Sequence, residues 1–218
     1  MAPPGDCTLP APKGAAVSTQ NLVGWLLVSG LVTFTVGAAR WRLEYEQPLE
    51  TSLPLKAAAT RRLRWIHYWM MIGVALTSVG LGATAVLAQS PWGAVAAVLY
   101  AMGATAWLIA LTFRLTVEEW AAAETVTTGT VPSMYPPLAA SWVGLYGLHM
   151  MTAYIAAIPL AFVVAAEDLG PGWLGWAGGV WGAVFAAGFM VTRGAGLFSP
   201  PILAHLFTGA VGVALLLD

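Results

Sequence analysis

Cysteine and charge are both scarce in this sequence of 218 residues. The only cysteine is Cys7, so an intramolecular disulfide and a thiolate metal cluster are both excluded. Charged residues make up 9% of the chain, whereas a soluble domain carries about a quarter. The nine basic residues are dispersed through the chain and form no patch of the kind that nucleic-acid binding requires, so we expect no nucleic-acid partner.

Familiar catalytic motifs are absent as well. The sequence has no GxSxG elbow, Walker loop, HExxH or CxxC, which leaves the hydrolase, nucleotide, zinc-protease and thiol-redox classes without their first indication. The closest group of carboxylates is Glu118, Glu119 and Glu124. Adjacent residues of a helix point about 100° apart, so Glu118 and Glu119 are not placed as a catalytic carboxylate pair. We expect the three carboxylates to form a solvated face. We therefore expect a membrane component and not a self-contained enzyme.

Apolar residues are abundant: they make up 59% of the chain and gather in six long uncharged runs. The runs span residues 22–39, 65–87, 92–113, 138–166, 173–192 and 197–217. A bilayer core needs about 20 apolar residues per helix, and hydrocarbon requires every backbone polar group to be bonded internally. The sequence predicts an all-α polytopic bundle of about six spans, with a single transmembrane domain over 21–218. The proline-rich segment 1–20 is expected to be a flexible tail.

The basic residues indicate how the bundle is oriented in the membrane. Six of them lie between the first two runs, one follows the third run and one follows the fifth, whereas the opposite side has only Lys13. The positive-inside rule then places both termini on the non-cytoplasmic side. We expect the protein to be a multi-pass component of a bacterial cytoplasmic membrane, in contact with lipid and with other membrane subunits as candidate partners.

Three histidines, His67, His149 and His205, lie within the apolar runs. An ionisable residue in a membrane is a functional-site hypothesis by default. Counted from the cytoplasmic end, His149 and His205 lie at similar depths, as the two axial ligands of a b-type haem would. His67 lies near the start of its run and is a weaker third candidate. The structural alternative is that neutral histidines hydrogen-bond neighbouring helices and bind no cofactor.

Tyr146 and Thr152 share a helical face with His149, since all three recur at intervals of three residues. Such a polar stripe is typical of interhelical hydrogen bonding, and it is also compatible with a substrate path in a small-molecule channel or carrier. Glycines at 175, 178, 179 and 182 form two small-xxx-small patterns, 175 with 179 and 178 with 182, which predict a close helix contact within the bundle.

The C-terminal third contains WLGWAGGVWGAVFAAGFM at 173–190 and LFSPPILAHLFTGAVGVALL at 197–216. These segments resemble uncharacterised families of bacterial multi-pass membrane proteins. The resemblance implies a helical inner-membrane protein and assigns no site residue. Taken together, the sequence favours a structural or accessory membrane component. The alternatives are a haem b electron-transfer subunit and a small-molecule carrier.

Overall fold

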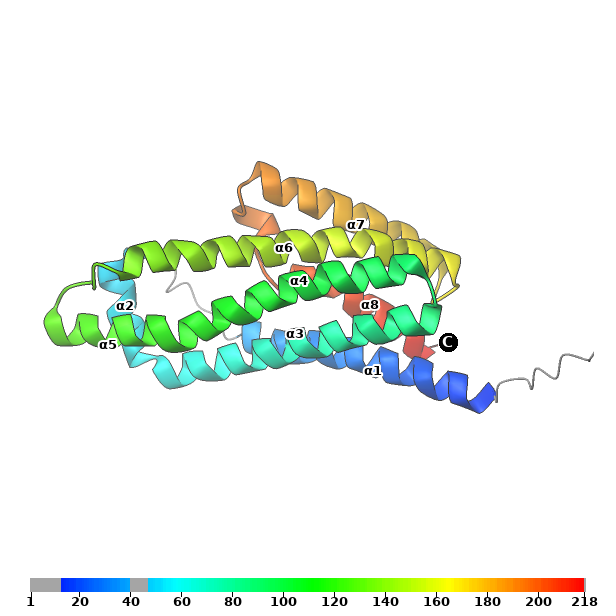
Figure 1. Cartoon of the computed structure of the whole chain (residues 1–218), viewed down its shortest axis with the longest axis horizontal. Helices are drawn as coiled ribbons and strands as arrows, with labels where there is room; N and C mark the ends of the chain where they lie inside the picture. The colour runs from blue at the N-terminus through cyan, green and yellow to red at the C-terminus, as the bar shows by residue number, and fades with distance from the viewer. Residues whose placement is uncertain (1–12, 40–46, 218) are drawn as a thin grey trace, which may run out of the picture.

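The computed structural model describes residues 13–39 and 47–217, and these are helical with short connections (Figure 1). The α-helices are α1 (Lys13–Ala38), α2 (Leu49–Ala58), α3 (Thr60–Ala88), α4 (Pro91–Phe113), α5 (Glu119–Thr128), α6 (Tyr135–Ala166), α7 (Gly172–Val191) and α8 (Leu203–Leu217). A π-helical turn, η2 (Arg114–Glu118), joins α4 to α5, and a 3₁₀ turn, η3 (Gly196–Phe198), precedes α8. The all-α prediction is confirmed for the described residues.

Five helical segments are long and apolar enough to cross a membrane. They cover Thr19–Ala38, Thr60–Ala88, Pro91–Thr128, Tyr135–Ala166 and Gly172–Val191. The chain is therefore a multi-pass helical membrane protein. Helix α1 begins at Lys13, inside the segment that the sequence assigned to a tail, and the rest of that prediction, residues 1–12, lies outside the described residues.

The last apolar run does not form one continuous helix. Residues 197–217 were predicted as a full span, but the chain makes a 3₁₀ turn at 196–198 and α8 begins only at Leu203. The two prolines at 200 and 201 lie between these elements and keep the helix from starting earlier. Fifteen residues give α8 a length of about 22 Å, which is shorter than a hydrocarbon core of about 30 Å.

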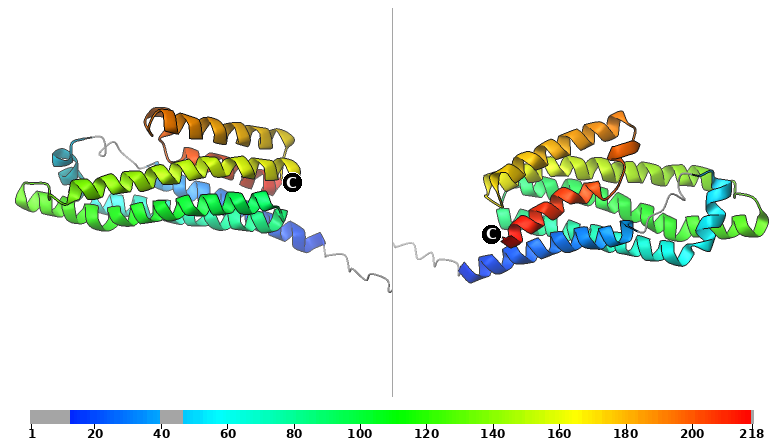
Figure 2. Two further views of the ribbon diagram at one scale, coloured as in Figure 1. Left: turned by 45° about the horizontal axis from the view of Figure 1, so that its top comes forward. Right: turned by 180° about the vertical axis from the view of Figure 1, so that it is seen from behind.

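The long helices lie side by side, with α7 outside α6 and α8 between α1 and α6 (Figures 1 and 2). Glycine allows some of these close approaches. A Cβ on Gly73 of α3 would lie 2.6 Å from the backbone nitrogen of Phe34 in α1, and one on Gly212 of α8 would lie 2.9 Å from the carbonyl of Gly24 in α1. Small residues let the backbones meet where lipid supplies no hydrophobic drive for association.

The glycine pattern of α7 makes the predicted contact within the chain. A Cβ on Gly175 or Gly182 would lie 2.9 Å or less from a backbone carbonyl of α6, so these two residues form the contact with that helix. Gly178 instead makes room for the ring of Phe207 in α8, and a Cβ on Gly179 would lie in ordinary van der Waals contact with Cβ of Ala161 in α6, at 3.8 Å. The predicted pair 175 with 179 thus lies against α6, with the closer approach at Gly175, whereas the pair 178 with 182 is divided between α8 and α6.

Beyond the predicted spans, α2 packs on α5 at one end of the bundle (Figures 1 and 2). This end has its own small core, in which Leu53, Ala121 and Tyr135 are buried. The chain stays helical beyond residue 113, as far as Thr128, and the helix stops at Gly129, where φ is +75°. Glycine suits that left-handed C-terminal position.

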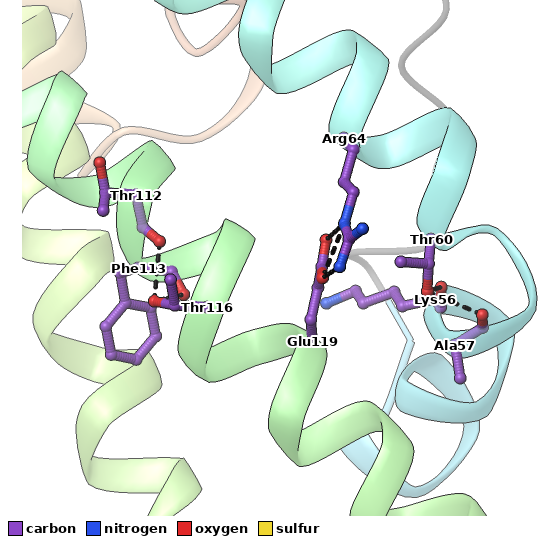
Figure 3. Close-up of polar contacts among 8 residues, drawn as sticks. All are labelled: Lys56, Ala57, Thr60, Arg64, Thr112, Phe113, Thr116 and Glu119. Carbon is purple, nitrogen blue, oxygen red and sulfur yellow. Dashed lines mark hydrogen bonds and ion pairs between the residues drawn. The ribbon is translucent and has the colours of Figure 1, made fainter.

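The predicted solvated face of carboxylates is wrong for Glu118, which is 3% exposed. Its Oε1 lies 2.6 Å from Nζ of Lys56 and accepts a hydrogen bond from the Tyr135 hydroxyl at 3.0 Å. Glu119 pairs with the exposed guanidinium of Arg64, with a shortest distance of 2.6 Å (Figure 3). The error arose because α2 is a covering element that no apolar run indicates.

Candidate functional site

His149 of α6 and His205 of α8 lie together inside the bundle. Both side chains are fully buried, and their ring centroids are 5.8 Å apart with the ring planes 37° from parallel. Helix α8 can bring His205 to this depth because it lies between α1 and α6. Of the three histidines that the sequence singled out, the structure brings these two together.

Three of the four ring nitrogens of this pair have no hydrogen-bond partner among the described residues. They are Nδ1 and Nε2 of His149 and Nε2 of His205. The backbone of Gly103 lies beside His149, but it does not meet hydrogen-bond geometry with the ring. Buried polar atoms in proteins are almost always bonded, so three such atoms in one place make this pair a candidate ligand-binding site.

Tyr100 of α4 holds the fourth nitrogen. Its hydroxyl oxygen lies 3.0 Å from Nδ1 of His205, and the tyrosine is itself fully buried. If Nδ1 carries the proton and donates it to the tyrosine oxygen, Nε2 of His205 is left with a free lone pair. This is the arrangement by which a second residue fixes the tautomer and orientation of a metal-ligating histidine.

Aromatic rings surround the two imidazoles. Trp107 of α4 stacks on His149 with a centroid distance of 5.3 Å and an interplanar angle of 15°. Phe34 of α1 lies 4.0 Å from His205, centroid to centroid. No cluster of three or more His, Cys, Asp or Glu side chains occurs in the described part of the chain, so a metal held here would have two protein ligands of these types.

His67 of α3 belongs to another part of the molecule. It is buried, and the charged side chains that act on it are Arg114 and Lys56, at the end of the bundle that α2 covers. This position separates the weakest of the three candidates from the pair. It also makes His67 a useful internal control, because it is equally buried and lies in the same membrane protein.

The two other predicted site residues bond to backbone. Thr152 donates to carbonyls of its own helix, at Leu148 and His149. The hydroxyl of Tyr146 donates to the carbonyl of Ser199, and a second tyrosine of α6, Tyr154, donates to the carbonyl of Phe198 at 2.9 Å. The two tyrosines thus bond carbonyls of the segment between α7 and α8, and of the stripe residues Tyr146 fits the interhelical interpretation whereas Thr152 bonds within its own helix.

A cavity of about 660 Å³ opens beside the pair. Its aromatic lining residues are Trp107, Trp142, Tyr146 and Phe189, and the two arginines among its lining residues are Arg114 and Arg193. The Arg114 guanidinium lies over the ring of Trp142, with Cζ 3.7 Å from the ring centroid. The buried indole nitrogen of Trp107 has no hydrogen-bond partner among the described residues. A volume of this size is typical of a small-molecule site.

Sequence reasoning missed Tyr100, Trp107 and Arg193. The two aromatic residues lie in the middle of an apolar run, where they are indistinguishable from packing residues. Arg193 was used only as a marker of orientation. None of the three occurs in a pattern that names a site, and they become candidates only when α4, α6, α7 and α8 are placed together.

Comparisons with known proteins identify no relative. No protein-family model matches the chain, and neither the curated proteins nor the solved structures include a match.

Proposed function

We propose that this protein is a membrane subunit that holds one b-type haem between His149 and His205. The observation that carries the proposal is the pair of fully buried imidazoles, 5.8 Å apart and with three nitrogens unbonded among the described residues. Two imidazoles bonded to one metal atom at about 2.0–2.1 Å would have centroids about 6 Å apart. The spacing therefore accommodates one metal atom between the rings.

Charge and ligand number favour haem over a bare ion. A divalent zinc or iron ion usually needs four or more ligands, and the described residues supply two imidazoles and no third side chain of the usual ligating types. A bare ion would also bring its full charge into an apolar interior, which costs several kcal/mol. A bound porphyrin would supply four nitrogens and two negative charges, so the two neutral imidazoles would be the protein ligands that the iron still needs.

The chain's own residues have defined tasks in this proposal. His149 and His205 would bind the iron, and Tyr100 would hold the tautomer of His205. Bound haem would supply a one-electron redox centre within the membrane. Helix α8 contributes one ligand and α6 the other, so the cofactor would also join these two helices. A protein of this kind would be an accessory subunit, because it would transfer electrons and would not itself convert a substrate.

The test is a reduced-minus-oxidised visible spectrum of the detergent-purified protein, with haem content measured as the pyridine complex. We expect about one haem per chain and low-spin reduced bands. His149→Ala and His205→Ala should each lose the bands, whereas His67→Ala should retain them because His67 lies apart from the pair.

A second variant guards against misfolding in the alanine substitutions. His205→Met keeps a metal-ligating side chain and should retain haem, with a higher reduction potential than the unmodified protein. A monodisperse, helical wild-type protein that was expressed with ample haem and shows no bands would refute the proposal. Retention of unchanged bands in both alanine variants would refute it equally.

A further inference from the structure

The aromatic cavity beside Trp107 has the chemistry of a binding site, and the haem proposal does not use it. It lies between α4, α6, α7 and the segment leading into α8, and Ala38 at the end of α1 also lines it. Four aromatic rings provide flat apolar walls. Arg114 is 2% exposed and lies against one of these rings, whereas Arg193 is exposed to solvent.

Two observations point to a ligand with an anionic group. The indole nitrogen of Trp107 is a buried donor that meets no acceptor among the described residues, and Trp107 lines the cavity. Among the described residues that line it, the charged ones are both arginines. A molecule with an acceptor oxygen would satisfy the indole, and a negative charge would be attracted by the guanidinium groups.

Arg193 lies in the left-handed turn that ends α7. Its φ is +52°, in the left-handed region that is unfavourable for most residues other than Gly, Asn and Asp. Gly194 follows at +74°. A left-handed residue just after a helix end is a common C-terminal cap, and Gln89 and Asp168 adopt the same conformation after α3 and α6. Here the left-handed turn places an arginine among the residues that line the cavity.

We propose that this cavity binds an anionic amphiphile, with its apolar part against Trp107, Trp142, Tyr146 and Phe189 and its negative group at Arg193 and the indole of Trp107. The orientation rule places Arg193 at the cytoplasmic end of α7, where membrane and water meet. Two sources share this chemistry: the acidic headgroup of a membrane lipid, and a water-soluble aromatic acid. The proposal does not rest on haem binding at His149 and His205.

The experiment uses the full chain in nanodiscs of phosphatidylcholine and titrates 8-anilino-1-naphthalenesulfonate, an anionic aromatic probe. Energy transfer from tryptophan to the probe should show a saturable component above the background of empty nanodiscs. Arg193→Asn keeps a residue that tolerates a positive φ and removes the charge, so it should fold and bind roughly tenfold more weakly. Trp107→Phe should also weaken binding, because it removes the hydrogen-bond donor of the indole and keeps an aromatic ring.

Two controls match these variants. Arg193→Lys keeps the charge and should retain binding within a few-fold, and Arg61→Gln removes an exposed arginine elsewhere on the chain and should leave binding unchanged. Adding phosphatidylglycerol to the nanodiscs distinguishes the sources: competition with the probe identifies the lipid headgroup, and no competition identifies a soluble acid.

The proposal fails if no saturable component appears, or if Arg193→Asn and Arg61→Gln weaken it equally. The haem spectrum of Arg193→Asn should remain that of the unmodified protein, so loss of probe binding with intact bands cannot be confused with failure of the haem proposal.

Discussion

Replacing Glu118 by glutamine tests whether the buried ion pair holds α2 against the rest of the molecule. The Lys56 and Glu118 side chains are 6% and 4% exposed, and their charged atoms are 2.6 Å apart. Glutamine keeps the shape of the side chain and its capacity to bond Tyr135, but it removes the charge that faces Lys56.

The expected cost follows from the burial of the pair. Breaking a buried pair by removing one partner costs about 3–5 kcal/mol, and we expect about 3 kcal/mol here because the amide retains a hydrogen-bond acceptor. The neighbouring Glu119→Gln is the matched control. Its partner Arg64 is 57% exposed, and an exposed pair contributes at most about 1 kcal/mol.

The assay is reversible unfolding in mixed micelles, combined with amide hydrogen exchange in α2 and α5. We expect Glu118→Gln to lower the free energy of unfolding by about 3 kcal/mol and to speed exchange in both helices, with little change for Glu119→Gln. Equal effects of the two substitutions would show that burial of Glu118 does not govern the stability of this end of the bundle.

Three further predictions concern packing, the histidine pair and topology. Gly178→Leu should prevent α7 from docking, because a Cβ there would lie 1.9 Å from Cζ of the Phe207 ring. Gly82→Leu should be tolerated, because a Cβ there would meet nothing within 4 Å. Size-exclusion profiles and thermal unfolding of the two variants test the difference. Tyr100→Phe should keep the haem bands, raise the reduction potential and cost about 1 kcal/mol of stability, because His205 loses its partner at Nδ1. An unchanged reduction potential would contradict the orienting role of Tyr100. In a cysteine-free background, a membrane-impermeant maleimide should label Gln89→Cys in intact cells and Thr130→Cys only after permeabilisation, and the reverse pattern would invert the proposed orientation.

The sequence predicts the helical class and five of the spans well, because long uncharged apolar runs have few other stable conformations. It does not predict that the last helix begins at Leu203, because hydropathy does not register the turn formed by the 3₁₀ segment and the two prolines. It also misplaces Glu118. Helix α2 is too short and too polar to register as a run, and without it the carboxylate has no partner.

The candidate site was likewise predicted in part from the sequence. The similar depths of His149 and His205 were predicted by counting residues, and the structure shows the two rings in proximity. The count cannot tell which helices face one another, so it gives no reason to include Tyr100 or Trp107.

The short C-terminal helix has a mechanical consequence for the surrounding membrane. Helix α8 covers about 22 Å, and its outward residues include Leu206 and Val213, which are 37% and 46% exposed. A hydrophobic surface that is several ångströms shorter than the bilayer draws the adjacent leaflet inward, at a cost of fractions of a kcal/mol per ångström. The protein would thus carry a local dimple beside α8, and shorter acyl chains should gather there in preference to longer ones.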